Sequence, residues 1–172
     1  VAKHFNSRYL FFSSSEVYQT ALVNPTPETY VGAIPSMNER SCYDVSKLLG
    51  ETLAYVYGNQ GVHTNVIRLF NSFGAGQKES DKRILPRIAS AIVGKRPVRI
   101  YSHGQRGLPR RTYTPVANTV FGVFLTMLRG EKSEVYNVGL DSPELTTINL
   151  CERIAHATGL EVVGPAETPA IP

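Results

Sequence analysis

A continuous apolar run from Tyr9 to Phe12 ends at once in the polar stretch Ser13 to Glu16. Unbroken apolar runs of this kind are typical of strands buried on both faces of a parallel sheet. Open parallel sheets hold their ligands just beyond the carboxyl ends of their strands. The stretch therefore places three hydroxyl groups and a carboxylate where such a sheet would present them to a ligand.

The rest of the chain alternates between strand patterns and helix patterns. A stretch rich in β-branched residues from Val62 to Phe70 predicts a strand, and apolar residues recur at helical spacing from Ile84 to Val93. The same criteria predict helices at 43–57, 116–128 and about 147–157, and short strands at 99–101, 112–115 and 134–138. Alternation of this kind indicates an α/β fold with a mostly parallel sheet.

Composition and charge exclude several kinds of partner. The 172 residues carry a formal net charge of +4, but the basic residues form no long run interleaved with aromatic ones, so we expect no nucleic-acid partner. No apolar run is long enough to span a membrane. Cys42 and Cys151 lack metal-ligand spacing, so we expect no metal site. We interpret both as reduced thiols of a cytoplasmic protein, with Cys42 as a small buried residue.

Tyr43 and Lys47 are four residues apart in the helix expected at 43–57. At that spacing both side chains lie on one helix face, close enough for the ammonium to act on the phenol. A phenol with an ordinary pKa of about 10 is a poor base at neutral pH, and a fixed cation beside it favours the phenolate. The spacing by itself is also compatible with a solvated helix face.

Three features in order carry a resemblance to a known family. The first strand closes in Ser-Ser-Ser-Glu-Val-Tyr, a Tyr-x-x-x-Lys helix follows, and the next strand ends in Arg-Leu-Phe-Asn-Ser-Phe-Gly from Arg68 to Gly74. The chain thereby resembles the extended short-chain dehydrogenase/reductase family, in its NAD-dependent nucleotide-sugar epimerase/dehydratase branch. The resemblance implies that 1–76 form the C-terminal half of a Rossmann-like NAD-binding domain, 77–164 a small α/β nucleotide-sugar-binding region, and 165–172 a tail.

The resemblance also implies a reaction. In this family NAD oxidises the sugar at C4 and gives a 4-keto intermediate. Tyr43 would take the proton of the C4 hydroxyl, and Lys47 would assist it and hold the nicotinamide ribose. Ser14, three places before Val17, would bond the same sugar oxygen. Taken alone, Ser14 is also compatible with a strand-end hydroxyl that bonds to the backbone.

The reaction that follows the oxidation depends on Glu16. UDP-glucuronate decarboxylases resemble this chain in having a hydroxyl residue, Ser and Glu in sequence, here Ser14, Ser15 and Glu16. They also share the pattern Arg-Ser-x-Tyr-Asp-x-x-Lys, which starts here at Arg40. A ketone at C4 turns a C5 carboxylate into a β-keto acid, which loses carbon dioxide readily. The 4-epimerases and 4,6-dehydratases share much of this pattern and stay open as alternatives.

Two more residues are implied for the nucleotide part of a UDP-linked sugar. Asn71 matches the residue that bonds a phosphate, and Arg111 matches the arginine that meets the pyrophosphate, while Ser15 would contact the sugar. The fixed donors of a guanidinium suit such anions. Arg110 competes for the role of Arg111 if the alignment shifts by one residue.

The sequence also departs from the family pattern. Gln19 stands where a glycine commonly follows Val-Tyr, and no Gly-rich dinucleotide fingerprint is found. The run Gly74-Ala75-Gly76 is followed by polar residues, so we interpret it as a substrate loop. We therefore expect part of a longer enzyme, which alone would bind NAD weakly, or a non-catalytic sugar-nucleotide-binding module. We also expect a homodimer, formed through helices that include the one with Tyr43.

Overall fold

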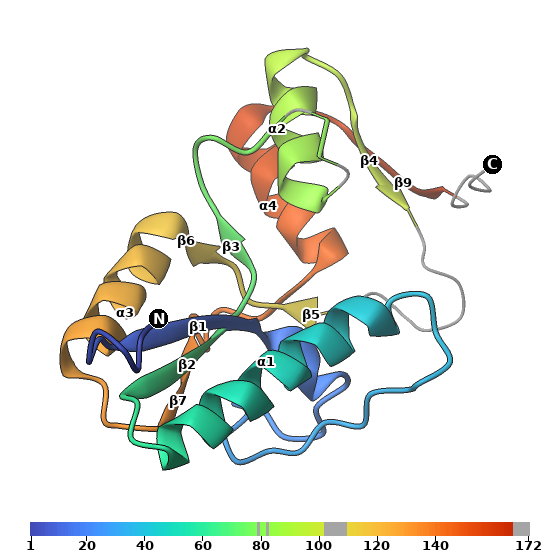
Figure 1. The fold of residues 1–172 in the computed structure, drawn as a ribbon. Coiled ribbons are helices and arrows are strands. Elements are labelled where there is room, and N and C mark those ends of the chain that lie inside the picture. The colour runs from blue at the N-terminus through green and yellow to red at the C-terminus, as the bar shows by residue number, and fades with distance from the viewer. Residues whose placement is uncertain (79, 82, 102–109, 167–172) are drawn as a thin grey trace. The chain divides into compact units, whose positions relative to one another are not determined.

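A computed structural model describes residues 1–78, 80–81, 83–101 and 110–166 (Figure 1). Two compact units emerge. Unit 1 consists of Val1–Ser72 and Thr114–Asp141, and unit 2 of Phe73–Tyr113 with the segment from Ser142 onward. Residues 114–141 thus return to unit 1, although the sequence assigned them to the second region. The reason is a strand in this segment that pairs with the sheet of unit 1.

Unit 1 is built on a parallel three-stranded sheet in the order β1-β2-β7. The strands are β1 (Tyr9–Ser14), β2 (Thr64–Leu69) and β7 (Val135–Val138). The elements packed around them are the 3-10 turn η1 (Ser15–Tyr18) and the helices α1 (Ser41–Asn59) and α3 (Val116–Arg129). Strands, helices and parallel pairing confirm the α/β fold expected from the sequence.

The two helices of unit 1 cover opposite faces of the sheet. A Cβ at Gly50 of α1 would collide with the ring of Phe11, and a Cβ at Gly122 of α3 would collide with the side chain of Val138. Phe11 faces α1, whereas Val138 is in register with Leu69, and side chains alternate between faces along a strand. Both helices therefore come close to the sheet because they lack a side chain at the contact.

The first strand is less buried than its sequence indicates. Tyr9 and Phe12 are 44% and 46% exposed, because β1 pairs in the described chain with β2 alone and so forms an edge of the sheet. Cys42 is exposed too, and the expectation that it is buried was wrong. It lies in the first turn of α1, on the side turned away from the buried residues Ser41 and Asp44.

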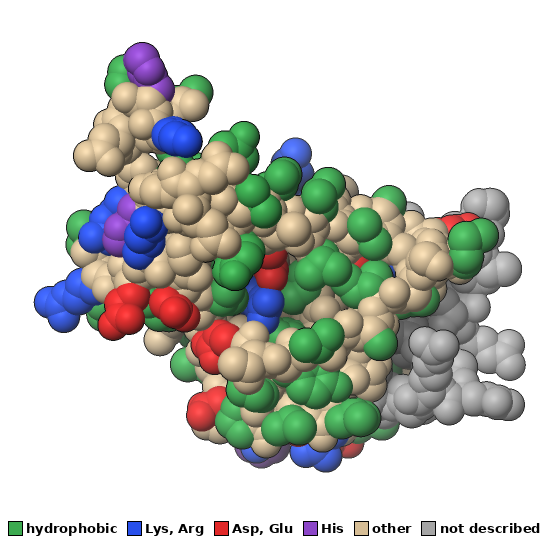
Figure 2. Space-filling view, turned by 60° about the horizontal axis from the view of Figure 1, so that its bottom comes forward, with side chains coloured by type: hydrophobic (Ala, Val, Ile, Leu, Met, Phe, Trp, Pro, Cys, Tyr) green, Lys and Arg blue, Asp and Glu red, His purple; other side chains and the backbone are tan. Residues whose placement is uncertain are grey.

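Helix α1 also presents apolar side chains to solvent. It runs through the buried Gly58, where the sequence predicted a stop, and ends just before Gly61, which has a φ of 97°. Figure 2 shows how widely hydrophobic side chains reach the visible surface. On α1 the exposed aliphatic ones are Val45, Leu48, Leu49, Leu53 and Val56.

Unit 2 packs two helices against a pair of parallel strands. The helices are α2 (Ile84–Val93) and α4 (Thr147–Thr158), and the strands are β4 (Val98–Tyr101) and β9 (Val162–Ala166). The shorter strands of the chain are β3 (Ser72–Phe73), β5 (Arg110–Arg111), β6 (Thr114–Pro115) and β8 (Leu145–Thr146). The core of unit 2 contains Ile88, Ala91, Val98, Ile100, Leu150 and Cys151.

The ends of α4 follow its sequence signals. Thr146 is the N-cap, and its hydroxyl accepts a hydrogen bond from the Asn149 amide, while Gly159 ends the helix in the left-handed conformation. The tail expected at 165–172 begins inside β9, and residues 167–172 lie outside the described chain. No described helix is long and apolar enough to cross a membrane.

Candidate functional site

The carboxyl end of β1 is shaped by a hydroxyl cap. The Oγ of Ser14 accepts a hydrogen bond of 3.2 Å from the backbone N–H of Glu16 and so caps the 3-10 turn η1. A serine hydroxyl that accepts in this way still has its own hydrogen to donate. Ser14, Ser15 and Glu16 are all partly exposed, so the strand end is accessible to a ligand.

Tyr43 and Lys47 lie on one face of α1, as their spacing predicts. The Nζ atom of Lys47 is 5.5 Å from the centre of the Tyr43 ring. The same ammonium donates a 2.9 Å hydrogen bond to the carbonyl oxygen of Phe12, two residues before Ser14. Tyr43 is 47% exposed. The structure therefore places the phenol and ammonium beside the end of β1, with the phenol open to a substrate.

A second group of contacts surrounds this site. Arg40 forms a 3.1 Å ion pair with Glu16, and Asp44, which is only 3% exposed, accepts a 2.7 Å hydrogen bond from the side-chain amide of Gln19. Gln19 has a φ of 53°, in the region that favours glycine. The backbone conformation at this position explains why glycine suits it. The side-chain amide gives glutamine a role there, since it donates to Oδ2 of the buried Asp44 carboxylate, whose Oδ1 has no hydrogen-bond partner in the described chain.

A buried ion pair that was not predicted from the sequence lies next to this site. Glu51 of α1 and Arg68 of β2 meet at 2.6 Å, with side chains 9% and 11% exposed. Although burial alone would lower the pKa of Arg68, hydrogen bonds to Glu51 and Tyr18 raise it above the ordinary value. Spacing along the helix favours Lys47 as the partner of Glu51, so no local signal in the sequence points to Arg68, which lies on another element.

Asn71 lies at the same edge of the sheet as Ser14. Ser14 is in register with Leu69, and Asn71 follows two residues later, after the end of β2. The backbone carbonyl of Asn71 accepts a 2.9 Å hydrogen bond from the Thr114 amide. The two strand ends thus place the side chains of Ser14 and Asn71 at one edge.

Arg111 belongs to unit 2, and the structure does not place it relative to Tyr43. It lies exposed on β5, and within the described residues it donates a local 3.3 Å hydrogen bond to the carbonyl oxygen of Arg110. Arg110 forms a 2.9 Å ion pair with Glu144. Burial raises the pKa of the Tyr113 hydroxyl, and the positive charge of Arg111 partly opposes this. Of the two arginines, Arg110 already has a carboxylate partner.

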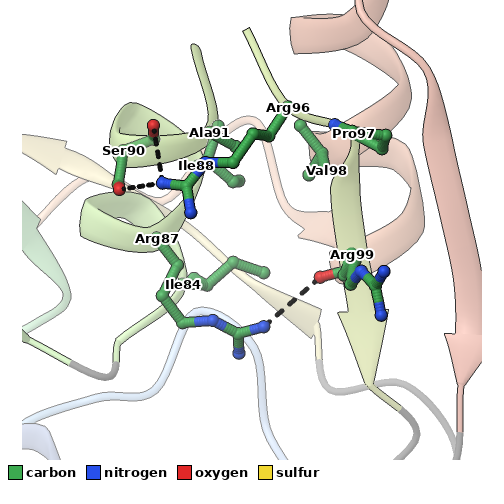
Figure 3. Close-up of a pocket in the computed structure, with 9 residues that line it drawn as sticks. All are labelled: Ile84, Arg87, Ile88, Ser90, Ala91, Arg96, Pro97, Val98 and Arg99. Atoms are coloured by element: carbon green, nitrogen blue, oxygen red, sulfur yellow. Dashed lines mark hydrogen bonds between the residues drawn. The ribbon is translucent and has the colours of Figure 1, made fainter. Parts of the chain in front are cut away.

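A basic pocket lies between α2 and β4 within unit 2 (Figure 3). Its volume is about 480 Å³, and the residues described in its lining include Arg87, Arg96 and Arg99 but no carboxylate. One Nη atom of Arg96 donates to the Ser90 hydroxyl at 2.8 Å, and one of Arg87 donates to the carbonyl oxygen of Arg99 at 3.4 Å. Three guanidinium groups around one cavity suit an anionic ligand. The pocket could not be predicted from the sequence, because its three arginines are not adjacent in the chain.

The loop at Gly74–Gly76 lines another cavity of unit 2, of about 470 Å³. The other side of this cavity is formed mainly by α2 and includes Leu85 and Ile88. No helix begins after the loop before Ile84 in the described residues. This arrangement differs from the strand, glycine turn and helix that hold a dinucleotide pyrophosphate.

Comparison with a family model decides the assignment. The model described as the NAD dependent epimerase/dehydratase family matches residues 1–139, well over half of the chain. The chain belongs to this family. It is a family of enzymes for which NAD is the cofactor.

Curated relatives of this epimerase/dehydratase chain include UDP-glucuronic acid decarboxylases. UDP-glucuronic acid decarboxylase 1 of Arabidopsis thaliana is 33% identical over 170 residues, which cover 98% of this chain and 37% of the relative. The protein of the same name from Danio rerio is 32% identical over 149 residues, covering 86% of this chain and 34% of the relative. The chain thus spans about a third of the length of these relatives.

Solved structures show the same fold. A UDP-glucose 4-epimerase from Thermotoga maritima, with UDP-glucose, superposes with a TM-score of 0.81 at 22% identity, covering 98% of this chain and 52% of that one. A dTDP-glucose 4,6-dehydratase from Bacillus anthracis, in complex with NAD, gives a TM-score of 0.79 at 20% identity, covering 97% and 50%. At these identities the likeness establishes a Rossmann-like fold for the chain.

Proposed function

We propose that this chain is the catalytic and substrate-binding part of an enzyme that oxidises C4 of a nucleotide sugar with NAD and decarboxylates UDP-glucuronate. The observation that carries the proposal is the Lys47 ammonium, held 5.5 Å from the Tyr43 ring on a helix packed beside Ser14. The similarity to UDP-glucuronic acid decarboxylases supports this choice of substrate. The coverage of the relatives is partial, so the activity of the whole protein is part of the proposal.

The first step is the removal of a proton. Tyr43 takes the proton of the C4 hydroxyl, Ser14 donates a hydrogen bond to the same oxygen, and the ammonium of Lys47 favours the phenolate. NAD, when bound, is the oxidant for the C4 alcohol. Its ribose hydroxyls fit the donor set of this site, because the Lys47 ammonium has three donors and one hydrogen bond to the carbonyl oxygen of Phe12.

Decarboxylation then follows from the ketone. The bond between C5 and its carboxylate breaks, carbon dioxide leaves, and the electron pair moves into an enolate on the C4 oxygen. A proton returned to C5 restores the ketone, and the two electrons that return this ketone to the C4 alcohol would come from the cofactor that was reduced in the oxidation of C4. Glu16 is placed to assist this protonation, and its ion pair with Arg40 supplies a cation that limits repulsion with the substrate carboxylate.

Recognition of the nucleotide would involve residues of both units. Ser15 and Asn71 lie at or just beyond the strand ends of unit 1, and we assign them to the sugar and a phosphate. In unit 2 we assign Arg111 to the pyrophosphate in preference to Arg110, which is paired with Glu144. We propose the basic pocket of α2 and β4 as a further anionic contact, because its lining has three guanidinium groups and no carboxylate.

The assembly and cellular setting are further parts of the proposal. The exposed apolar residues Leu48, Leu49 and Leu53 on α1 support a homodimer through this helix. We assign the protein to the cytoplasm, with no nucleic acid or membrane as partner. Light scattering of the wild type and of a variant with L49E and L53E tests the dimer. An unchanged mass in the variant would contradict a homodimer through α1.

A 4-epimerase or 4,6-dehydratase is the second candidate, favoured by the structural likeness to such enzymes with NAD or a UDP-sugar bound. To separate the candidates, the protein with its native flanking sequence is mixed with NAD and UDP-glucuronate, and products are followed by mass spectrometry. Carbon dioxide with a UDP-pentose supports decarboxylation. Interconversion of neutral UDP-hexoses would change the assigned reaction to epimerisation. Absence of both turnover and NAD binding would favour a non-catalytic binding module.

A further inference from the structure

Lys47 has a carboxylate within easy reach on its own helix and does not use it. Glu51 lies one turn beyond Lys47 on α1, where side chains four residues apart are neighbours. Lys47 instead donates to the carbonyl oxygen of Phe12 at 2.9 Å. Something must therefore keep the carboxylate of Glu51 away from the ammonium.

Arg68 covers both oxygens of that carboxylate. The Nε of Arg68 donates to Oε1 of Glu51 at 2.9 Å, and one Nη donates to Oε2 at 2.6 Å. Oε1 also accepts a hydrogen bond from the hydroxyl of Ser13, the neighbour of Ser14 on β1. Such a bidentate arrangement fixes the direction of the carboxylate as well as its charge.

Arg68 is in turn held by other parts of unit 1. Its second Nη donates to the Tyr18 hydroxyl at 2.7 Å and to the carbonyl oxygen of Glu28 at 2.8 Å. The Tyr18 hydroxyl donates to the Asn137 side chain at 2.8 Å. The guanidinium is thus fixed by hydrogen bonds to η1, α1 and the loop after η1.

We propose that Arg68 is a positioning residue for the Tyr43–Lys47 pair, because it occupies Glu51 and so prevents Glu51 from capturing the Lys47 ammonium. Through Ser13 the same carboxylate also ties α1 to the strand that carries Ser14. The proposal rests on the roles assigned to Tyr43 and Lys47 above. It adds a reason why a buried ion pair stands one turn from the reacting groups.

Other charged groups near this face of α1 keep their own partners. Asp44 accepts from Gln19, Glu16 pairs with Arg40, and the carboxylate of Glu28 accepts from the Asn137 amide. Burial raises the pKa of the Tyr18 hydroxyl, so this group stays neutral in the physiological range. Oδ1 of Asp44 lacks a hydrogen-bond partner in the described chain, yet Lys47 donates to Phe12 and not to it. Of the carboxylates described here, Glu51 is the one that loses its partner when Arg68 is removed.

The test uses NMR spectra of lysine ammonium groups in the ¹³C,¹⁵N-labelled chain, with K47R to assign the Lys47 signal. In R68M we expect a scalar coupling between the Lys47 Nζ and the Glu51 carboxylate, which is absent from the wild type and from E51Q/R68M. Without that coupling in folded R68M, the proposal is overturned. If R68M does not fold, R68K replaces it under the same criterion, because a lysine cannot cover both oxygens.

The second measurement is the pH dependence of turnover in the protein with its native flanking sequence. In R68M the acid limb of the kcat profile should move to higher pH, and in E51Q/R68M it should return toward the wild type. A purely structural role for Arg68 would leave the limb in place in both variants and contradict the proposal. If the wild type shows no turnover, the proposed function fails, while the ammonium spectra still decide the positioning role.

Discussion

The two units of the chain differ in the charged side chains that surround their candidate sites. In unit 1 the groups near the strand ends are paired with one another: Glu51 with Arg68 and Glu16 with Arg40, while Asp44 accepts from Gln19. Unit 2 also has the ion pairs Arg83–Asp81 and Arg110–Glu144, but the described lining of its α2–β4 pocket has three arginines and no carboxylate. The difference indicates that the site of unit 1 is held by contacts among its own charged groups, whereas the described lining of the pocket in unit 2 is basic.

The largest effect on turnover should come from removing the hydroxyl group of Tyr43 in unit 1. We expect Y43F to lower kcat by about 100-fold to 10,000-fold, because a positioned base contributes that much. Tyr43 is half exposed, so the free energy of unfolding should barely change. Y55F, on an exposed tyrosine of the same helix, is the matched control. Steady-state kinetics with near wild-type kcat for Y43F would contradict the assignment.

The next prediction tests the pairing in unit 1 through stability. R68M should lower the free energy of unfolding by about 3–5 kcal/mol, because it removes the bidentate partner of the buried Glu51 carboxylate, which the single ammonium of Lys47 cannot fully replace. E51Q/R68M should recover much of this loss, since no charge then stays buried. R83M, which breaks the exposed pair with Asp81, should leave the urea midpoint unchanged. Equal losses in R68M and R83M would remove the contrast between buried and exposed pairs.

A substitution in the basic pocket of unit 2 should change the affinity for a ligand but not the stability of the protein. R99M should weaken binding of UDP by about 10-fold, the value of one charge-assisted hydrogen bond, and leave the urea midpoint unchanged. Isothermal titration calorimetry measures the affinity. K132M, which removes an exposed lysine of unit 1, controls for net charge. Equal weakening in both variants would mean that the pocket has no specific part in binding.

The smallest effect concerns Gln19. Both Q19A and Q19G remove the hydrogen bond to Asp44, but only alanine keeps a side chain at a φ of 53°. We expect Q19G to be more stable than Q19A by about 1–3 kcal/mol, the typical cost of such a backbone conformation. Urea denaturation of both variants measures the difference. Equal stability would show that the backbone at this position is not strained.

Local sequence patterns predicted most helices and strands of the fold, but they could not predict contacts between residues that are distant in the sequence. The helix expected at 84–93 is confirmed as Ile84–Val93, because its apolar spacing and the following glycine are local signals. Strand β9 was missed, since its pairing with β4 joins segments about sixty residues apart in sequence. The family resemblance is confirmed by the match over residues 1–139, whereas the roles of Ser14, Glu16, Tyr43 and Lys47 stay predictions.

The site was visible in the sequence only where the chain brings its residues close together. Spacing alone predicted that Tyr43 and Lys47 share a helix face. Glu51 and Arg68 lie on different elements, and only tertiary packing brings them together. The departure at Gln19 was evident from the sequence, but its partner Asp44 was not, because the contact requires η1 to pack against α1.

The path of the chain has a consequence for anyone who wishes to divide this protein. The backbone passes between the units three times, after Ser72, Tyr113 and Asp141. No single cut therefore yields either unit whole, and truncation after Tyr113 would strip β7 and α3 from the sheet that carries Ser14. Exchange of unit 2 between relatives would need its two segments, 73–113 and the segment from Ser142 onward, to be grafted together.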